Sequence, residues 1–131
     1  MEFELVHVFS ATPEEVYRAF LSSDEHSKMT GAEAEVSDRI GGNFTAWDGY
    51  ISGHNLELVE GKKIVQNWRT EDFEEGQPDS LLEIQLEPIE NGQTALKLIH
   101  KDLPESDTQY VKGWQDYYFN PMEIYFSSLK K

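Results

Sequence analysis

The sequence has 131 residues and no cysteine, and its 11 Lys and Arg residues against 25 Asp and Glu residues give a formal net charge of −14. This length suffices for one domain, residues 1–131, with a single hydrophobic core, and the absence of cysteine excludes disulfides and thiol chemistry. A surface this acidic repels phosphate backbones and anionic lipids, so we exclude binding to nucleic acid and to a membrane surface.

No stretch of the sequence approaches the roughly 20 apolar residues that a membrane-spanning helix needs. The first five residues carry neither the basic segment nor the apolar segment of a secretory signal. We therefore expect a cytoplasmic protein, and the absence of cysteine fits a reducing environment.

The first quarter of the chain predicts a strand followed by two short helices. Residues 2–10 alternate imperfectly between apolar and polar side chains, as a well-covered strand does. A helix is expected to begin next, with Thr12 as its cap, Pro13 in the first helical position and Glu15 completing a capping box. A second short helix is expected next, with Asp24 as its cap and Met29 near its end.

From residue 33 onward the apolar pattern changes to a period of two, which predicts antiparallel strands. The dipeptides Asp48-Gly49 and Asn91-Gly92 are typical of tight hairpin turns, since their residues tolerate positive φ. Residues 71–80 form an acidic loop that is too polar to belong to the core. The predicted strands are residues 33–37, 43–47, 50–59, 62–70, 82–87 and 94–101.

The last predicted element is one long helix over residues 106–131. Ser106 and Gln109 have the spacing of a capping box, and apolar residues then recur at three- and four-residue steps on one broad face. Pro121 predicts a kink or a break near Asn120, and a glycine at position 113 predicts close approach to a neighbouring element. The face is rich in Tyr and Trp, so it suits either a core helix with satisfied polar tips or a lid over a cavity.

These elements predict an α+β fold with an antiparallel sheet of six to seven strands. One face of the sheet is polar, so the other must be covered, and only the terminal helix is long enough to cover it.

Several short motifs occur in a fixed order along the chain. They are Ala11-Thr12-Pro13-Glu14-Glu15-Val16-Tyr17, Gly42-Asn43-Phe44, Asp48-Gly49, Gly53, Trp68, Leu103-Pro104 and Gly113-Trp114-Gln115-Asp116-Tyr117-Tyr118-Phe119. Their order resembles the SRPBCC or START-like superfamily, and its branch named for the C-terminal domain of the activator of the ninety-kilodalton heat-shock chaperone ATPase. The last motif is similar to the Gly-Trp-Gln-x-Tyr-Tyr-Phe run of that co-chaperone.

The resemblance implies a helix-grip fold, in which a curved antiparallel sheet wraps around a long C-terminal helix, as in Bet v-like proteins. It also implies three candidate functions: binding of a ligand in a cavity under the helix, stimulation of a heat-shock chaperone ATPase, and a cyclase-type reaction. In the co-chaperone a separate N-terminal domain anchors the protein to the chaperone, and the present sequence matches the C-terminal domain alone.

The sequence offers little support for catalysis. None of the four histidines lies at metal-ligand spacing from another, and no nucleophile elbow, phosphate-binding loop or dinucleotide fingerprint occurs. Asp72, Glu74 and Glu75 cluster on a polar loop, where carboxylates are normally solvated. His100 is expected to be structural or pocket-lining rather than a catalytic base. We predict no catalytic residue, no metal and no cofactor.

Our main hypothesis is a binding module that encloses a small apolar or aromatic molecule between the sheet and the terminal helix. The alternative for the same side chains is that they close on one another as an ordinary core. The expected lining residues are Phe44, Trp68, Leu96, Leu98 and His100 from the sheet, with Trp114, Tyr117 and Tyr118 from the helix.

The second hypothesis is a protein-interaction module that acts on a heat-shock chaperone. Phe119, Met122 and Phe126 lie close together on the helical wheel, at the edge of the buried face. A partly exposed apolar stripe there would suit docking or self-association. A kink at Pro121 could instead turn the three side chains inward, and both arrangements stay open.

Overall fold

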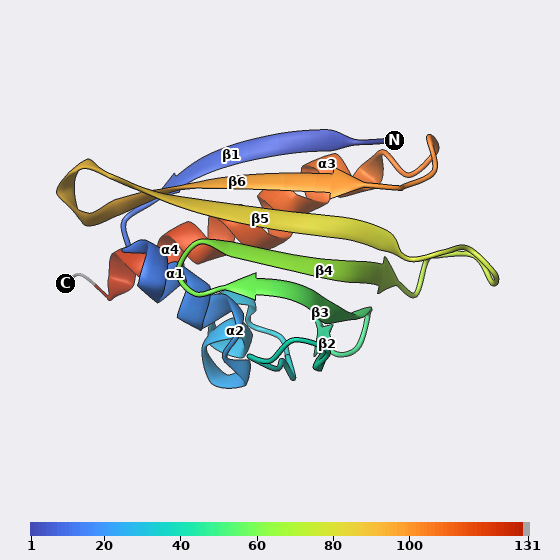
Figure 1. The fold of residues 1–131 in the computed structure, drawn as a ribbon, viewed down its shortest axis with the longest axis horizontal. Coiled ribbons are helices and arrows are strands. Elements are labelled where there is room, and N and C mark those ends of the chain that lie inside the picture. The colour runs from blue at the N-terminus through green and yellow to red at the C-terminus, as the bar shows by residue number, and fades with distance from the viewer. Residues whose placement is uncertain (130–131) are drawn as a thin grey trace.

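The terminal helix crosses one face of a six-stranded antiparallel sheet in a computed structural model that describes residues 1–129 (Figure 1). The sheet has the order β1-β6-β5-β4-β3-β2. Its strands are β1 (Phe3–Phe9), β2 (Asn43–Ala46), β3 (Ile51–Val59), β4 (Lys63–Thr70), β5 (Ser80–Ile89) and β6 (Gln93–Lys101). The helices are α1 (Pro13–Phe20), α2 (Ser23–Thr30), α3 (Gln109–Trp114) and α4 (Asn120–Ser128), with a π-helical turn over Gln115–Phe119 between the last two. The α+β helix-grip fold is therefore confirmed.

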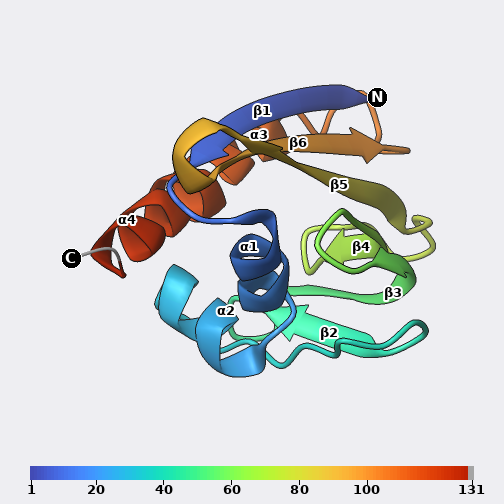
Figure 2. The same cartoon turned by 60° about the vertical axis from the view of Figure 1, so that its left-hand side comes forward.

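The two faces of the sheet differ as the strand pattern predicts, because side chains alternate between faces along each strand. On β5, Leu82, Ile84 and Leu86 are buried on the inner face, whereas Glu83 and Gln85 stay partly exposed on the outer face. Figure 2 shows how the sheet curves, with α4 on the side of β1, and α1 packs against β5 and β6. The buried inner face and these helices enclose the core.

The predicted start of α1 is confirmed in detail. Thr12 Oγ1 accepts a hydrogen bond from the Glu15 N–H at 3.2 Å, and Glu15 Oε1 accepts one from the Thr12 N–H at 2.9 Å. Helix α2 begins two residues earlier than predicted, because Ser22 rather than Asp24 supplies the cap and accepts from the Glu25 N–H at 3.3 Å.

Residues 33–37 do not form the strand that their alternation predicts. They contribute a single bridge, between Glu35 and Thr45. Side chains bind the backbone of this segment instead: the Asn55 amide group donates to Ser37 O at 2.8 Å and to Arg39 O at 3.0 Å. A backbone held by side chains in this way has fewer groups left for a ladder.

The hairpin between β2 and β3 is longer than the predicted two-residue turn. Ala46 pairs with Ile51, so the loop holds four residues, 47–50. Trp47 and Asp48 both adopt left-handed backbone angles, with φ of 54° and 58°. This longer loop carries two aromatic side chains toward the terminal helix.

The predicted capping box at Ser106 is wrong, because the helix begins only at Gln109, with Thr108 as its cap. The Asp107 N–H donates to Pro104 O at 3.0 Å. The residues expected to open the helix are therefore used in a turn that follows the proline. Lys130 and Lys131, predicted at the other end of the helix, lie outside the described residues.

The helix widens where the sequence predicts a kink or a break. The Asn120 N–H donates to Gln115 O, five residues back, and the backbone angles at Asn120 remain helical. A proline in a helix lacks a donor and collides with the carbonyl four residues earlier, and a wider turn before Pro121 accommodates it without ending the helix.

The widened turn also keeps one face of the helix on the sheet. A residue spacing of four advances the side chain by about 40° on a regular α-helix, so a long series with this spacing would drift away from the core. The π-helical turn takes up part of that drift. The buried residues that recur at this spacing are Tyr110, Trp114, Tyr118, Met122 and Phe126.

The proposed partner surface on this helix is corrected by the same observation. Phe119, Met122 and Phe126 are each only 1% exposed and belong to the core. Phe126 packs edge-on against Phe9 of β1, with ring centroids 5.7 Å apart. These side chains have turned inward, as the alternative allowed, and they offer no surface to a partner.

The acidic loop after β4 also contributes to the core, against prediction. Phe73 is buried, and its ring lies 6.2 Å from Trp68 and 6.1 Å from Tyr110 between centroids. The loop is therefore anchored beside the helix by one apolar residue, although its other side chains are mostly polar.

Candidate functional site

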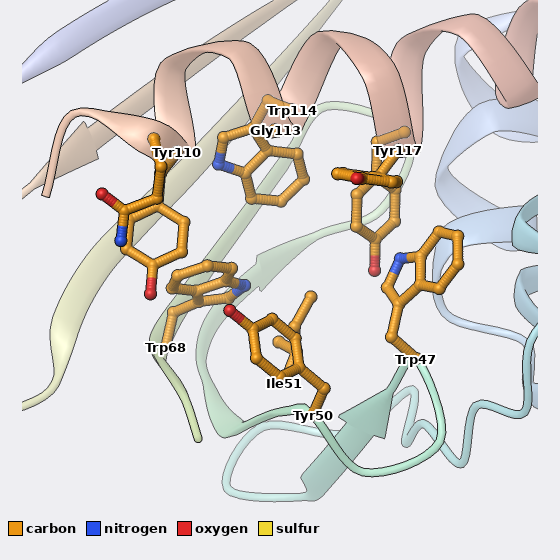
Figure 3. A pocket seen from close by; sticks show the side chains of 10 residues that line it. Trp47, Tyr50, Ile51, Trp68, Tyr110, Gly113, Trp114 and Tyr117 are labelled. Atoms are coloured by element: carbon orange, nitrogen blue, oxygen red, sulfur yellow. The ribbon is translucent and has the colours of Figure 1, made fainter. Parts of the chain in front are cut away.

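A half-open cleft of about 390 Å³ lies between the terminal helix and the β3–β4 half of the sheet (Figure 3). Its size is in the range of small-molecule pockets. Ten residues line it: Trp47, Tyr50, Ile51, Trp68, Gln109, Tyr110, Gly113, Trp114, Tyr117 and Tyr118.

The cleft has walls from three elements. Trp68 of β4 and Ile51 of β3 rise from the sheet, and Trp47 and Tyr50 come from the loop between β2 and β3 (Figure 3). The terminal helix supplies the opposite wall. At the mouth, the Trp47 ring meets the Tyr117 ring edge-on at a centroid distance of 5.6 Å.

Gly113 helps to keep this space open. A Cβ atom built at Gly113 would meet no heavy atom of the described chain within 4 Å. The expected close approach at this glycine is therefore wrong: it faces the cleft rather than a neighbouring backbone. The other half of the sheet differs, since Leu96 and Leu98 of β6 are buried there in solid core.

A buried histidine fixes the inner wall of the cleft. Trp114 Nε1–H donates to His100 Nδ1 at 3.0 Å, which leaves the ring proton on His100 Nε2. That proton faces Ser80 Oγ at 2.8 Å, and the Ser80 hydroxyl donates to Trp68 O at 2.8 Å. Burial lowers the pKa of His100 from 6.5 to about 3, so the imidazole is neutral at physiological pH.

A second buried histidine ties α2 to the helix. His26 Nδ1–H donates to Phe20 O at 2.8 Å, and Tyr118 donates its hydroxyl hydrogen to His26 Nε2 at 2.8 Å. Burial lowers the pKa of His26 and raises that of Tyr118, so both groups are neutral. The position of Tyr118 in the cleft wall is thereby fixed.

Two of the tyrosines that line the cleft make polar contacts. The Tyr110 and Thr70 hydroxyl groups lie 2.6 Å apart, and the Tyr50 hydroxyl donates to Asp72 Oδ2 at 2.5 Å. Burial and the hydrogen bond to Asp72 raise the pKa of Tyr50. Trp47 Nε1 is buried and has no hydrogen-bond partner among the described residues.

The structure brings together half of the residues predicted to line a cavity. Trp68, Trp114, Tyr117 and Tyr118 lie on the cleft. The other four lie behind it: Leu96, Leu98 and His100 are buried under the helix, and Phe44 packs against Gly53.

Sequence reasoning missed the other six lining residues, which are Trp47, Tyr50, Ile51, Gln109, Tyr110 and Gly113. The sequence does contain an indication for two of them. Trp47 and Tyr50 flank the Asp48-Gly49 turn, and an aromatic side chain at a turn is not packed against a neighbouring strand, so it is available to line a cleft.

The chemistry of the cleft favours binding. Seven of its ten lining residues are aromatic, and none carries a charge. Within residues 1–129, no three His, Asp or Glu side chains come close enough together to hold a metal ion. Within the same residues, no helix has both the length and the apolar composition to span a membrane.

Comparison with known proteins shows the family to which this chain belongs. The family model described as "Activator of Hsp90 ATPase homolog 1-like protein" matches residues 10–127. The chain belongs to this family. The match covers α1, every strand from β2 to β6 and most of the terminal helix, so it includes both walls of the cleft.

Relatives of the family are found in distant organisms. The human activator of 90 kDa heat shock protein ATPase homolog 1 is 34% identical over 124 residues, which are 93% of this chain and 36% of the human protein. The chain thus spans about a third of the length of this curated relative.

Two solved structures cover the chain almost completely. A Plasmodium falciparum protein described as an HSP90 activator has a TM-score of 0.87 and 26% identity, over 97% of this chain and 96% of its own. A Chromobacterium violaceum protein has a TM-score of 0.73 and 30% identity, over 94% of this chain and 95% of its own.

Proposed function

We propose that this domain binds a heat-shock chaperone of the 90 kDa class and stimulates its ATPase. The observation that carries this function is the likeness to the Plasmodium falciparum HSP90 activator, in which the two chains match over almost their entire lengths. Family membership over residues 10–127 supports the same function. The domain acts without chemistry of its own, as a binding protein in the cytoplasm.

The surface suits a partner with a basic face. The formal net charge of −14 makes the domain strongly acidic, and such a charge steers a basic partner and accelerates encounter. Apolar contact is available along the terminal helix, where Tyr117 at the mouth of the cleft is 59% exposed and Ile124 of α4 is 72% exposed. These two residues replace the buried stripe as candidates for the partner surface.

Direct binding tests this function. Calorimetric titration of purified 90 kDa heat-shock chaperone with the domain should give saturable binding that weakens as salt rises, since exposed charges are screened. The double variant Tyr117→Ser with Ile124→Ser should bind more weakly. A matched control, Val6→Ser with Val8→Ser, changes two exposed residues on the outer side of β1. Absence of heat in titrations at two well-separated temperatures would refute the function, because a binding enthalpy that is near zero at one temperature differs from zero at the other when apolar surface is buried.

A second function is binding of a small molecule in the cleft, and one specific observation favours it. The cleft is lined by aromatic rings, and it contains the buried Trp47 Nε1, which lacks a partner among the described residues. A ligand that fills the cleft in front of Trp68 and Trp114, and that offers an acceptor toward which the Trp47 ring turns, would satisfy this donor.

The tryptophans make the second function easy to measure. All three tryptophans of the chain line the cleft, so each indole N–H signal in an NMR spectrum reports on it. A panel of apolar and aromatic compounds should shift these signals in a saturable way. If no compound moves any indole signal, the second function is excluded and the first is unaffected.

A further inference from the structure

Four aromatic rings of the cleft wall pack directly against one another and form a continuous aromatic surface on one side of the cleft. Trp68 and Tyr110 meet edge-on at 5.2 Å between centroids, Trp68 and Trp114 are 5.8 Å apart, and Trp114 and Tyr118 are 4.7 Å apart. Trp47, Tyr50 and Tyr117 complete the ring of seven (Figure 3). The face of each ring carries negative electrostatic potential, and Trp attracts cations most strongly.

A carboxylate lies beside one of the lining residues of the cleft. Asp72 Oδ2 accepts the hydroxyl hydrogen of Tyr50, a lining residue, at 2.5 Å. The acidic loop is held there by its backbone, since the Glu71 N–H donates to Tyr50 O at 3.0 Å. Asp72 therefore adds a full negative charge beside the aromatic wall.

Basic side chains next to the cleft are already paired. Arg69 and Lys112 are the only basic residues adjacent in sequence to a lining residue. Arg69 contacts Asp79 at 2.6 Å, and Lys112 lies 3.9 Å from Asp116. None of the ten lining residues is basic, so the cleft itself carries no positive charge that would repel a cation.

We propose that the cleft binds an organic cation, namely a small molecule with a quaternary or alkylated ammonium group on an apolar or aromatic body. This inference rests on the ligand-binding function proposed above. The ammonium group would lie against the aromatic lining near Tyr50 and its partner Asp72, and the body would fill the cleft in front of Trp68 and Trp114. Alkylation matters because an alkylated ammonium group is weakly hydrated, and it therefore gives up little hydration free energy when it enters an aromatic site.

Two probes of the same shape but different charge show whether the charge of a ligand contributes to its affinity for the cleft. The cation (3-hydroxyphenyl)trimethylammonium and its neutral isostere 3-tert-butylphenol differ in one atom, nitrogen against carbon, and in charge. Both are titrated against the full chain, and the three indole N–H signals are followed. The cation should bind about tenfold more tightly, which is the size expected for a partly desolvated cation–π site.

Each result of the titration decides something. Equal binding of the two probes, or tighter binding of the phenol, overturns the cation specificity but leaves ligand binding in the cleft standing. Absence of indole shifts with both probes overturns the cation specificity together with ligand binding.

Two variants locate the effect. Asp72→Asn keeps a hydrogen-bond acceptor for Tyr50 but removes the charge, and it should weaken binding of the cation about threefold without changing the phenol. Tyr117→Leu removes an exposed ring while keeping an apolar surface, and it should lower the preference for the cation to a similar degree.

The matched control is Glu87→Gln, which removes the same charge from the exposed outer face of β5. It should leave both affinities unchanged. Equal weakening of both probes by Asp72→Asn, or an effect of Glu87→Gln as large as that of Asp72→Asn, would contradict a local role for Asp72.

Discussion

Gly113 lies on the terminal helix with open space in front of it. Whether its substitution raises or lowers the free energy of unfolding therefore tests that open space. Replacing a glycine by alanine within a helix stabilises it by about 1 kcal/mol, provided that the new methyl group meets no obstacle. A Cβ at Gly113 meets no heavy atom of the described chain within 4 Å. We therefore expect Gly113→Ala to raise the Tm by about 3–5 °C, the shift that 1 kcal/mol produces in a domain of this size.

A larger side chain at the same position should separate stability from binding. Gly113→Leu has nearly the same helix propensity as alanine, so its Tm should also be at or above that of the parent. Its side chain projects into the cleft of about 390 Å³ and should weaken binding of (3-hydroxyphenyl)trimethylammonium at least tenfold.

Thermal unfolding followed by circular dichroism measures the first effect, and titration of the indole NMR signals measures the second. Ser127→Ala, at an exposed position of α4, is the control for helix propensity and should leave binding unchanged. Destabilisation by Gly113→Ala would refute the open space in front of this residue. Full binding by Gly113→Leu would place the probe outside the cleft.

Three further predictions concern stability. Gly53→Ala should cost about 3 kcal/mol in chemical denaturation, since its Cβ would lie 2.0 Å from Asn67 O, and a cost near zero would contradict this packing. Burial lowers the pKa of His100 from 6.5 to about 3, so the unfolded chain binds a proton that the folded chain does not. The free energy of unfolding should therefore fall by about 2 kcal/mol between pH 7 and pH 5, and denaturant titrations that agree at the two pH values would be inconsistent with a neutral buried His100. Tyr118→Phe should lower the free energy of unfolding by about 1–3 kcal/mol because His26 Nε2 loses its donor, whereas an unchanged Tm would argue against that hydrogen bond.

The sequence predicts the order of the elements well because local signals and burial agree over most of the chain. The Thr12 capping box and the inward leucines of β5 are both found where their patterns place them. The predictions fail where a tertiary contact overrides a local signal. Residues 33–37 alternate like a strand, yet side chains bind their backbone: Ser27 Oγ accepts from the Ala34 N–H, Ser23 Oγ accepts from the Val36 N–H, and the Asn55 amide donates to Ser37 O.

The site was harder to predict than the fold. The inward-facing residues of β6 have the same pattern whether they line a cavity or fill a core, and Leu98 fills the core. The space depends instead on the four-residue loop that carries Trp47 and Tyr50, and on the missing side chain of Gly113. The π-helical turn, which precedes the buried Phe126, has no distinctive sequence signal beyond the nearby proline.

The most direct test of the proposed function is the ATPase turnover of a purified 90 kDa heat-shock chaperone, measured as the domain is added up to a large excess. We predict a saturable rise in turnover that is reduced by the double variant Tyr117→Ser with Ile124→Ser and is kept by the control Val6→Ser with Val8→Ser. Unchanged turnover at every concentration of the parent domain would contradict the proposed function.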